Sequence, residues 1–399
     1  MNLKYMDKKI ITAALLMTAS FMLASCGGGT KVNTDAVVED SAAQTAVTLP
    51  DSVISRKICP AYAEGFKIVS DRDGVRLVEV RDPQSSWSGA YKFALADRDA
   101  DVSGIDPSYT VVRVPVSKVL CMTTLQLSNF IKLGAVDKVT GITSSRYLFN
   151  EEIKKRIDEG RIMRIGIEGN FDSETIIAAS PDVILISPFK RGGYEALKDV
   201  GIPLVPHLGY KEMNPLGQAE WIKFVGMLTG MESAAITTFD KIADRYNELK
   251  KLADGQSVRP MVLSGEMRGG NWYAVGGKSF LAMLFRDAGA DYFLKNDENS
   301  GGMNLNYETV YSQAVHAQYW RIVNSHNGKY SYDVLRESDG RYADFDAFKN
   351  KGVIYCNMRE KPFYETMPVE PDVVLADLIA IFHPSLLPGH KAKYYELLK

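Results

Sequence analysis

The fold is decided by the stretch RIGIEGNFDSETIIAASPDVILIS, residues 164–187. Its middle predicts a short helix over Thr175–Ala179, which Asp172 can cap and which has Glu174 at its start. The apolar run Val183–Ser187 lies between two prolines and is typical of a strand buried on both faces. A helix that leads into a buried strand indicates a βαβ unit, and therefore a mostly parallel sheet.

The same alternation extends along most of the chain. In the first half, strands are expected at 111–114, 118–122, 138–143, 183–187 and 203–207, and helices at 124–133, 151–159, 175–179 and 194–200. The pattern resumes with elements at 261–264, 272–275, 279–288, 309–313, 320–324, 346–348 and 353–356, and ends in helices at 373–382 and 391–398. Two sets of alternating elements predict two α/β lobes.

A long helix separates the two sets. Apolar residues recur every three or four positions from Glu232 to Ala253, after a shorter amphipathic helix at Leu216–Leu228. At about 1.5 Å per residue the longer helix spans roughly 33 Å, which is enough to run along two lobes. The predicted fold is therefore α/β, with two lobes of mostly parallel sheet joined by a long rigid α-helix. Such a linker predicts only a small hinge closure when a ligand binds.

The N-terminal end carries the signs of export. Three lysines precede an apolar run from Ile10 to Leu23, which is typical of a secretion signal and too short for a membrane span of about 20 residues. The run ends in Leu-Ala-Ser-Cys26, which resembles the lipobox of bacterial lipoproteins. This resemblance implies cleavage before Cys26 and acylation of that residue. Two or more acyl chains would then anchor the protein stably to a membrane of the cell envelope.

The expected organisation has six parts. They are a signal peptide (1–25), a flexible lipoprotein tether (26–50), an N-terminal antiparallel β appendage (51–110), a first α/β lobe (111–215), the linking helices (216–257) and a second α/β lobe (258–399). The appendage is predicted from FKIVSDRDGVRLVEV at 66–80, where Asp73-Gly74 separates two β-rich runs as in a hairpin, and from a further strand at 91–95.

Composition and motifs argue against several classes of function. Removal of the signal leaves 44 basic and 48 acidic residues, and this balance argues against a nucleic-acid partner. The chain has no G-x-S-x-G, P-loop or G-x-G-x-x-G motif, so it is not expected to be an enzyme. No cofactor and no metal site are expected, because Cys59, Cys121 and Cys356 form no C-x-x-C pair and the histidines lack ligand spacing. The histidines are His207, His316, His326, His383 and His390, of which the first and fourth could contribute to a bare-metal site as an alternative.

Several segments resemble one known family. In the first lobe they are VPVSKVLCMTT, LGAVDKVTGIT, the stretch at 164–187 and LKDVGIPLV, and in the second lobe YAVGGKSFLAMLFRDAGADY, NYETV and PDVVLADLIAIFHPSLLPG. Together they cover residues 111–399 and are similar to the class III periplasmic solute-binding proteins of ABC importers, which bind iron chelates, haem or cobalamin. The appendage lies outside this resemblance, and residues 315–320 read VHAQYW where the family often has Pro-Asp.

The resemblance assigns a role to two glutamates. It implies that one surface glutamate on each lobe docks onto arginines of the membrane permease, and Glu174 and Glu308 occupy those positions. Each follows an Asx residue suited to cap a helix. From the residues alone, an acid in the first turn can equally serve only to complement the helix dipole.

The ligand is expected between the lobes, at the carboxyl ends of the strands, because open α/β sheets bind ligands there. Three loops at such ends combine basic and aromatic residues, which suit a large, flat or anionic ligand. The predicted ligand-binding residues are Arg146, Tyr147, Phe149, Phe189, Lys190, Arg191, Arg268, Trp272 and Tyr273. The segment Gly276–Ser279 opens a helix and could also present backbone N–H groups to an anion.

The expected function is capture of a small-molecule metal chelate, a ferric siderophore or haem, and its delivery to an inner-membrane ABC permease. A partner ATPase must supply the energy, because this chain has no nucleotide motif. Cobalamin is the alternative ligand. Two alternatives come from other classes of protein: a surface scavenger lipoprotein that works with an outer-membrane receptor, and an enzyme descended from the same fold.

Overall fold

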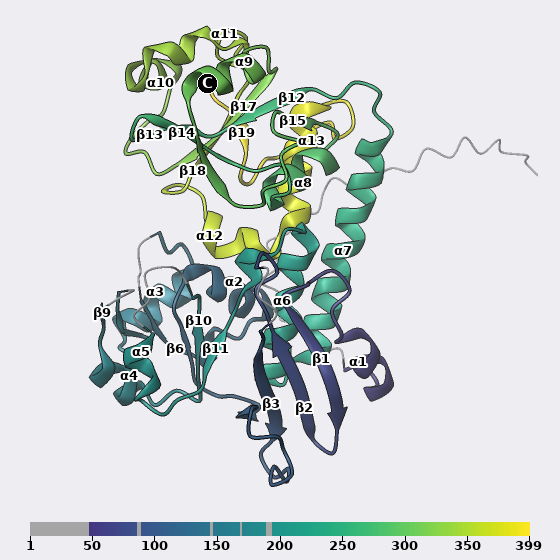
Figure 1. Cartoon of the computed structure of the whole chain (residues 1–399), viewed down its shortest axis with the longest axis vertical. Helices are drawn as coiled ribbons and strands as arrows, with labels where there is room; N and C mark the ends of the chain where they lie inside the picture. The colour runs from purple at the N-terminus through teal and green to yellow at the C-terminus, as the bar shows by residue number, and fades with distance from the viewer. Residues whose placement is uncertain (1–47, 86–88, 144–146, 168–169, 189–193) are drawn as a thin grey trace, which may run out of the picture. The chain divides into compact units, whose positions relative to one another are not determined.

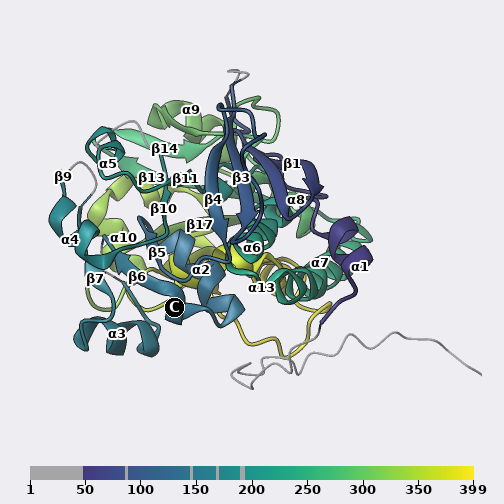
Figure 2. The same cartoon turned by 90° about the horizontal axis from the view of Figure 1, so that it is seen from below.

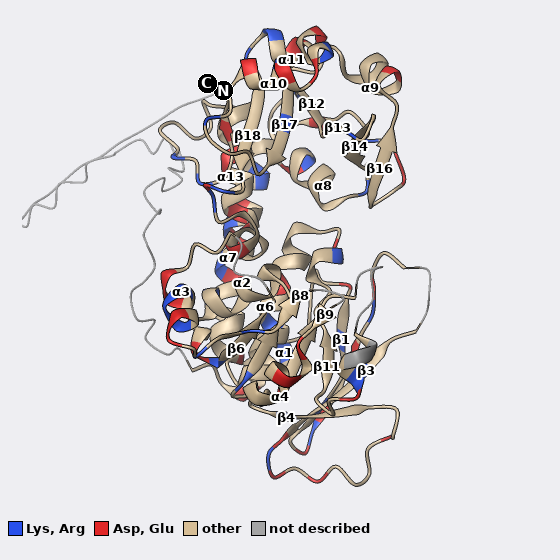
Figure 3. Ribbon diagram, turned by 90° about the vertical axis from the view of Figure 1, so that its left-hand side faces the viewer, with Lys and Arg blue, Asp and Glu red and all other residues tan. Residues whose placement is uncertain are grey.

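The computed structural model describes residues 48–85, 89–143, 147–167, 170–188 and 194–399 (Figure 1). The predicted signal peptide and Cys26 lie outside the described residues, and so do Arg146, Phe189, Lys190 and Arg191. None of the helices in the described ranges is both long and apolar enough to cross a membrane. Figure 3 shows acidic and basic residues interspersed on both lobes, in keeping with a formal net charge of −2.

The N-terminal appendage is a four-stranded sheet preceded by a short helix. Its elements are α1 (Asp51–Lys57), β1 (Phe66–Arg72), β2 (Val75–Val80), β3 (Tyr91–Asp97) and β4 (Thr110–Val114). β1, β2 and β3 are antiparallel neighbours, and the predicted hairpin turn has left-handed backbone at Asp73 (φ 56°) and Gly74 (φ 71°). The connection at 98–109 carries the chain back, so β4 adds to the sheet parallel to β3. The sheet therefore continues past the expected boundary at residue 110.

The first lobe has a five-stranded parallel sheet in the order β11-β10-β5-β6-β7. Its strands are β5 (Val119–Cys121), β6 (Val139–Ile142), β7 (Met163–Arg164), β10 (Val183–Ile186) and β11 (Leu204–Pro206). Its helices are α2 (Thr124–Leu133), α3 (Glu151–Asp158), α4 (Ser173–Ala179) and α5 (Glu195–Lys198), and a hairpin of β8 (Gly166–Ile167) and β9 (Asn170–Phe171) precedes α4. β10 is buried throughout, as predicted: Val183 and Leu185 join the main core, whereas Ile184 and Ile186 join a smaller core with Ile176 of α4.

The second lobe has a sheet in the order β15-β12-β17-β18-β19, whose first four strands are parallel. The strands are β12 (Met261–Ser264), β15 (Asp291–Tyr292), β17 (Tyr319–Asn324), β18 (Val353–Asn357) and β19 (Glu396–Leu397). The helices are α8 (Phe280–Asp287), α9 (Tyr307–Ala314), α10 (Tyr332–Ser338), α11 (Asp346–Lys349), α12 (Phe363–Thr366) and α13 (Pro371–Phe382). A separate antiparallel sheet consists of β13 (Glu266–Arg268), β14 (Asn271–Val275) and β16 (Gly302–Leu305).

The predicted helix at 391–398 is wrong. The segment contains β19, which is antiparallel to β18. The backbone N–H groups of Tyr394 and Tyr395 donate to the buried carboxylate of Asp377 at 2.7 and 3.0 Å. These bonds to α13 hold the chain in a non-helical path, so tertiary contacts override the local helix preference.

Two helices link the lobes, α6 (Pro215–Thr229) and α7 (Glu232–Asp254). α7 confirms the predicted long helix. It packs against α1 and α2 on one side of the link and against α8 and α13 of the second lobe, and Figure 2 shows α6, α7 and α13 side by side. Short 3₁₀ turns complete the structure at Val136–Lys138, Gly209–Lys211, Gly340–Asp344 and Met367–Val369.

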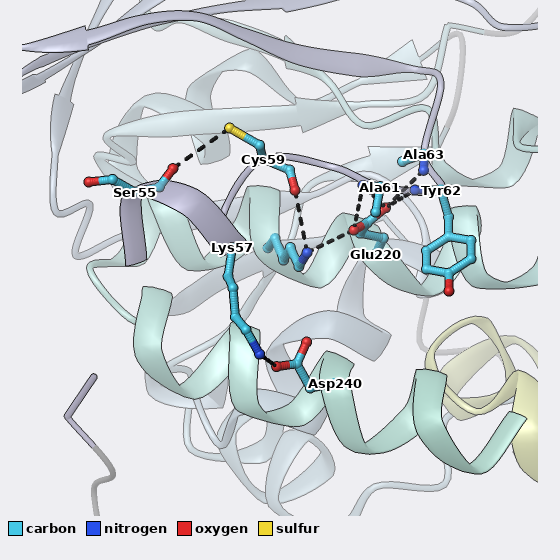
Figure 4. Close-up of polar contacts among 9 residues, drawn as sticks. Ser55, Lys57, Cys59, Ala61, Tyr62, Ala63, Glu220 and Asp240 are labelled. Atoms are coloured by element: carbon cyan, nitrogen blue, oxygen red, sulfur yellow. Dashed lines mark hydrogen bonds and ion pairs between the residues drawn. The ribbon is translucent and has the colours of Figure 1, made fainter. Parts of the chain in front are cut away.

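Two buried glutamates attach the appendage to the linking helices. Glu220 of α6 accepts hydrogen bonds from the backbone N–H groups of residues 61–63 at 2.7–3.0 Å, and it pairs with Lys223 at 2.7 Å (Figure 4). Glu212, just before α6, accepts the N–H groups of residues 64 and 65 at 3.0 and 2.8 Å. Five consecutive backbone N–H groups thus donate to two carboxylates, and these hydrogen bonds fix the path of the chain into β1.

Candidate ligand-binding cleft

A cavity of 270 Å³ lies at the carboxyl ends of β5 and β6. Residues that follow β18 in the second lobe, among them Met358, Lys361 and Phe363, form its opposite wall. The side-chain oxygen of Thr123, which precedes α2, is buried beside this cavity. The cavity is therefore lined from both lobes, at the place where open α/β sheets bind ligands.

Tyr147, one of the residues predicted to bind the ligand, lines this cavity. The guanidinium of Arg359, which follows β18, lies 5.3 Å from the centroid of the Tyr147 ring. The Nε atom of Arg359 donates to the carbonyl of Ser325 at 2.9 Å, which orients the side chain. Arg359 is not among the predicted ligand-binding residues, although it follows the strand VIYCN and ligands of open α/β sheets bind beyond strand ends.

Glu365 of α12 holds the loop that carries Tyr147. Its carboxylate is buried and accepts the backbone N–H groups of Phe149 and Asn150 at 3.0–3.2 Å. Burial raises the pKa of Glu365, and these hydrogen bonds oppose the rise. Phe149, also predicted to contact the ligand, is fixed through its backbone, and its side chain does not line the cavity that the described residues form.

The second lobe contributes a smaller cavity of 70 Å³ at the ends of β12 and β17. Two residues predicted to bind ligand, Arg268 and Tyr273, line it together with Arg321. The Arg268 guanidinium lies 4.9 Å from the Tyr273 ring centroid and pairs with Glu266 at 3.1 Å. Arg321 donates to the hydroxyl of Tyr395 at 2.7 and 3.1 Å. Arg321 lies within a strand and carries no local signal of function in the sequence.

Trp272 is a core residue, which corrects its predicted role as a ligand contact. The side chain is fully buried, and its indole N–H donates to the carbonyl of Ser264 at 3.0 Å. Its ring packs against those of Trp320 and Phe345. Successive side chains of a strand point to opposite faces, so exposure of Tyr273 on β14 directs Trp272 into the core.

A pair of stacked tyrosines lies near the carboxyl ends of β17 and β18. The rings of Tyr330 and Tyr355 have centroids 4.3 Å apart and planes 11° apart, and the Tyr355 hydroxyl donates to Asn324 at 2.8 Å. Burial, together with the nearby negative charge of Glu266, raises the pKa of Tyr330 to about 12 and also raises that of Tyr355. Both phenols are therefore neutral near pH 7. The two rings come from a loop and a strand 25 residues apart in the chain, so no local sequence pattern indicates their stacking.

A larger cavity, of 820 Å³, lies between α8 and the segment that precedes α6. Its charged side chains largely neutralise one another. Arg259 and Lys295 pair with Asp291 at 3.2 and 2.5 Å, and Lys250 pairs with Asp287 at 3.2 Å. We place the candidate cleft at the strand ends in spite of its smaller volume, because two arginines there, Arg359 and Arg321, form no ion pair with a carboxylate among the described residues.

The segment Gly276–Ser279 borders this larger cavity, and its local structure has another explanation. Ser279 Oγ accepts the N–H of Ala282 at 3.2 Å. A backbone donor at the start of α8, which was expected to bind an anion, is thus already bonded to the side chain that caps the helix. A Cβ on Gly276 or Gly277 would lie 2.1 or 2.2 Å from a neighbouring backbone carbonyl oxygen. Close backbone packing therefore accounts for both glycines.

Glu174 on α4 and Glu308 on α9 are both exposed. The caps predicted for their helices are confirmed: Asp172 Oδ1 and Asn306 Oδ1 each accept the N–H of the residue after the glutamate, at 3.0 and 2.7 Å. Within the described ranges, neither carboxylate forms an ion pair with a lysine or arginine. Both acids are thus available to a partner protein.

The cysteines that the structure describes differ in their exposure. Cys59 is exposed, Cys121 and Cys356 are buried, and all three are free thiols. Burial raises the pKa of Cys356 to about 12. In the part of the chain that the structure describes, no three His, Cys, Asp or Glu side chains are grouped so as to hold a metal ion.

Comparison with known proteins agrees with this architecture. Residues 119–360 match the family model described as periplasmic binding protein. Two uncharacterized lipoproteins of Methanocaldococcus jannaschii are 27% identical over 349 residues (83% of this chain, 78% of the relative) and 23% identical over 354 residues (86% and 85%). The match to the family model begins at β5, so the appendage precedes it.

Solved structures share the fold. A periplasmic heme binding protein from Pseudomonas aeruginosa superposes with a TM-score of 0.54 at 15% identity, covering 71% of this chain and 98% of that one. A possible iron-binding (periplasmic solute-binding) protein from Staphylococcus epidermidis gives 0.53 at 17% identity, covering 67% and 99%. At these identities the likeness concerns the fold alone.

Proposed function

We propose, on the basis that this chain belongs to the periplasmic binding protein family, that it captures an anionic iron chelate between its two lobes. Members of this family bind solutes, so the chain is a binding protein and not an enzyme. A ferric siderophore or haem has the proposed chemistry. The observation that carries the proposal is the position of Arg359 over the ring of Tyr147, from the opposite lobe and beside the 270 Å³ cavity.

The charges around the cleft favour an anionic ligand. Arg359 and Arg321 form no ion pair with a carboxylate among the described residues, whereas Arg268 pairs with Glu266 and Lys361 pairs with Glu396 at 3.4 Å. A guanidinium offers a planar set of donors that matches carboxylate or catecholate oxygens, and aromatic rings supply contact area. An anionic chelate would supply the negatively charged partner that these two guanidinium groups lack among the described residues.

The same proposal includes delivery and attachment. Glu174 and Glu308 would dock on the permease of an ABC importer, whose ATPase supplies the energy, and their exposure without a basic partner supports this role. Lipid on Cys26 would hold the chain at the membrane in the periplasm. The signal-like N-terminus and two relatives named as lipoproteins support this attachment.

Native mass spectrometry and absorbance spectroscopy of the full chain test the ligand. The probes are a ferric catecholate siderophore, a ferric hydroxamate siderophore, haem and cobalamin. We expect a one-to-one complex with an iron chelate, and about a tenfold or greater loss of affinity in Arg359→Gln or Arg321→Gln, because each removes a charged hydrogen bond of about 1.5–3 kcal/mol. The matched control is Arg72→Gln on β1, which makes the same charge change on the exposed appendage. Binding of cobalamin alone, or of no probe at micromolar concentration, would contradict the proposal.

A further inference from the structure

The helices α4 and α9 share more than a cap and a glutamate. In both, the residue two positions after the glutamate is fully buried, Ile176 in one and Val310 in the other. The next residue in each is a large apolar side chain that faces solvent: Ile177 is 58% exposed and Tyr311 is 37% exposed. Residues three apart on a helix are neighbours on its surface. Each helix therefore presents a carboxylate and a large apolar side chain together.

In the first lobe a second large apolar side chain is exposed on the hairpin that precedes α4. Ile167, on the hairpin before this helix, is 64% exposed. The N–H of Asp172 donates to the carbonyl of Ile165 at 3.1 Å, so this hairpin lies against the start of α4. We call Glu174, Ile177 and Ile167 the first patch. Two exposed isoleucines contribute little to the core of their own lobe, and exposed apolar groups beside charged ones are typical of interaction surfaces.

In the second lobe the corresponding surface is aromatic. Tyr311 stacks on Tyr307, one turn earlier in α9, with ring centroids 5.7 Å apart. Arg341 lies 4.4 Å from the centroid of the Tyr307 ring and pairs with Asp339, so it does not neutralise Glu308 by a direct ion pair. We call Glu308, Tyr311 and Tyr307 the second patch. The stacked rings make this patch more rigid than a single exposed tyrosine would be.

We propose that Ile177 and Tyr311 are contact residues for the permease, each buried by the partner beside the glutamate of its own lobe. This inference rests on the proposed docking function. Because both patches carry a negative charge, the partner must have basic groups. Because the arrangement occurs on both lobes, the partner must have two such sites, each with a basic group next to an apolar hollow. Burial of the apolar side chain excludes water from the adjacent ion pair and strengthens it, because the pair then lies in a medium of lower dielectric constant.

The test measures binding of the full chain to its importer's permease–ATPase complex in lipid nanodiscs, by biolayer interferometry at low and high salt. Ile177→Ser and Tyr311→Ser are each expected to weaken binding about five- to tenfold, since each loses burial of a large apolar side chain. The matched control is Val258→Ser between α7 and β12, where the side chain is 74% exposed and belongs to neither patch, and its binding is expected to be unchanged. Iron-chelate affinity is measured on the same samples and should be unaltered in all three variants.

Salt dependence separates the apolar contribution from the ionic one. The losses in Ile177→Ser and Tyr311→Ser should persist at high salt, whereas those in Glu174→Gln and Glu308→Gln should shrink because salt screens exposed charges. Wild-type binding by both serine variants, with weaker binding by the glutamine variants, overturns the inference and leaves the docking proposal intact. Undiminished binding by all four variants overturns both.

Discussion

Glu365 provides a direct test of how the cleft is held together. In Glu365→Ala the backbone N–H groups of Phe149 and Asn150 lose the carboxylate that accepts them at 3.0–3.2 Å. A hydrogen bond to a charged group is worth about 1.5–3 kcal/mol, but burial of the carboxylate already offsets part of this gain, as its raised pKa shows. We therefore expect the free energy of unfolding to fall by about 2–3 kcal/mol. Glu365→Gln keeps one acceptor oxygen and should lose about half as much.

The same substitution should loosen the cleft wall. Because the released loop carries Tyr147, the affinity for an iron chelate should fall about tenfold, and hydrogen exchange at the amides of residues 149 and 150 should accelerate. Urea denaturation, amide exchange and ligand titration measure the three effects. Glu151→Ala is the matched control, since it removes an 85% exposed carboxylate from the first residue of α3, directly after the loop that Glu365 holds. Unchanged amide exchange and a stability within about 0.5 kcal/mol of the wild type in Glu365→Ala would refute the reasoning.

Three further predictions concern the rest of the molecule. Glu220→Ala leaves Lys223 buried without its ion-pair partner, so the free energy of unfolding measured by urea denaturation should fall by about 3–5 kcal/mol. Adding Lys223→Met should restore part of this loss. A loss below about 1 kcal/mol in Glu220→Ala would contradict the prediction. Burial raises the pKa of Asp372 from 3.8 to about 6, so its stabilising contribution is complete below pH 3.8 and is lost as the pH rises through about 6. Asp372→Asn should therefore raise the thermal midpoint at pH 8 and change it little at pH 3.5, whereas equal shifts at both would count against this assignment. In a Cys26→Ser chain, Cys59 should be the only fast-reacting thiol with an aromatic disulfide reagent, and rapid labelling of a buried cysteine would disprove the burial pattern.

The elements that the sequence predicts best are those with strong local signals. The helix Thr124–Leu133 has the expected bounds, and the strand after Pro181 is buried on both faces as its apolar run indicates. The two helix caps that precede Glu174 and Glu308 were also predictable, because a cap depends on neighbours three residues apart.

The errors and omissions arise where distant residues decide. The helix expected at 391–398 is absent because Asp377 on another helix captures two backbone N–H groups. Whether Trp272 points into the core or to solvent depends on the alternation of side chains along a short strand. A short run of basic and aromatic residues does not indicate which of them points inward. Arg359 meets Tyr147 only because the chain returns to the first lobe after β18. Exposure of Ile177 likewise depends on what its helix packs against, which the local pattern does not contain.

The attachment of the N-terminal segment has a mechanical consequence. The N–H of Leu49 donates to Ser233 of α7, Lys57 pairs with Asp240 of the same helix, and the next stretch ends on Glu220 of α6. A tensile load applied at the N-terminal end of the described chain would thus enter through the two linking helices. The loops of the candidate cleft lie outside this load path, so tension on the N-terminal segment is expected to leave the geometry of that cleft unchanged.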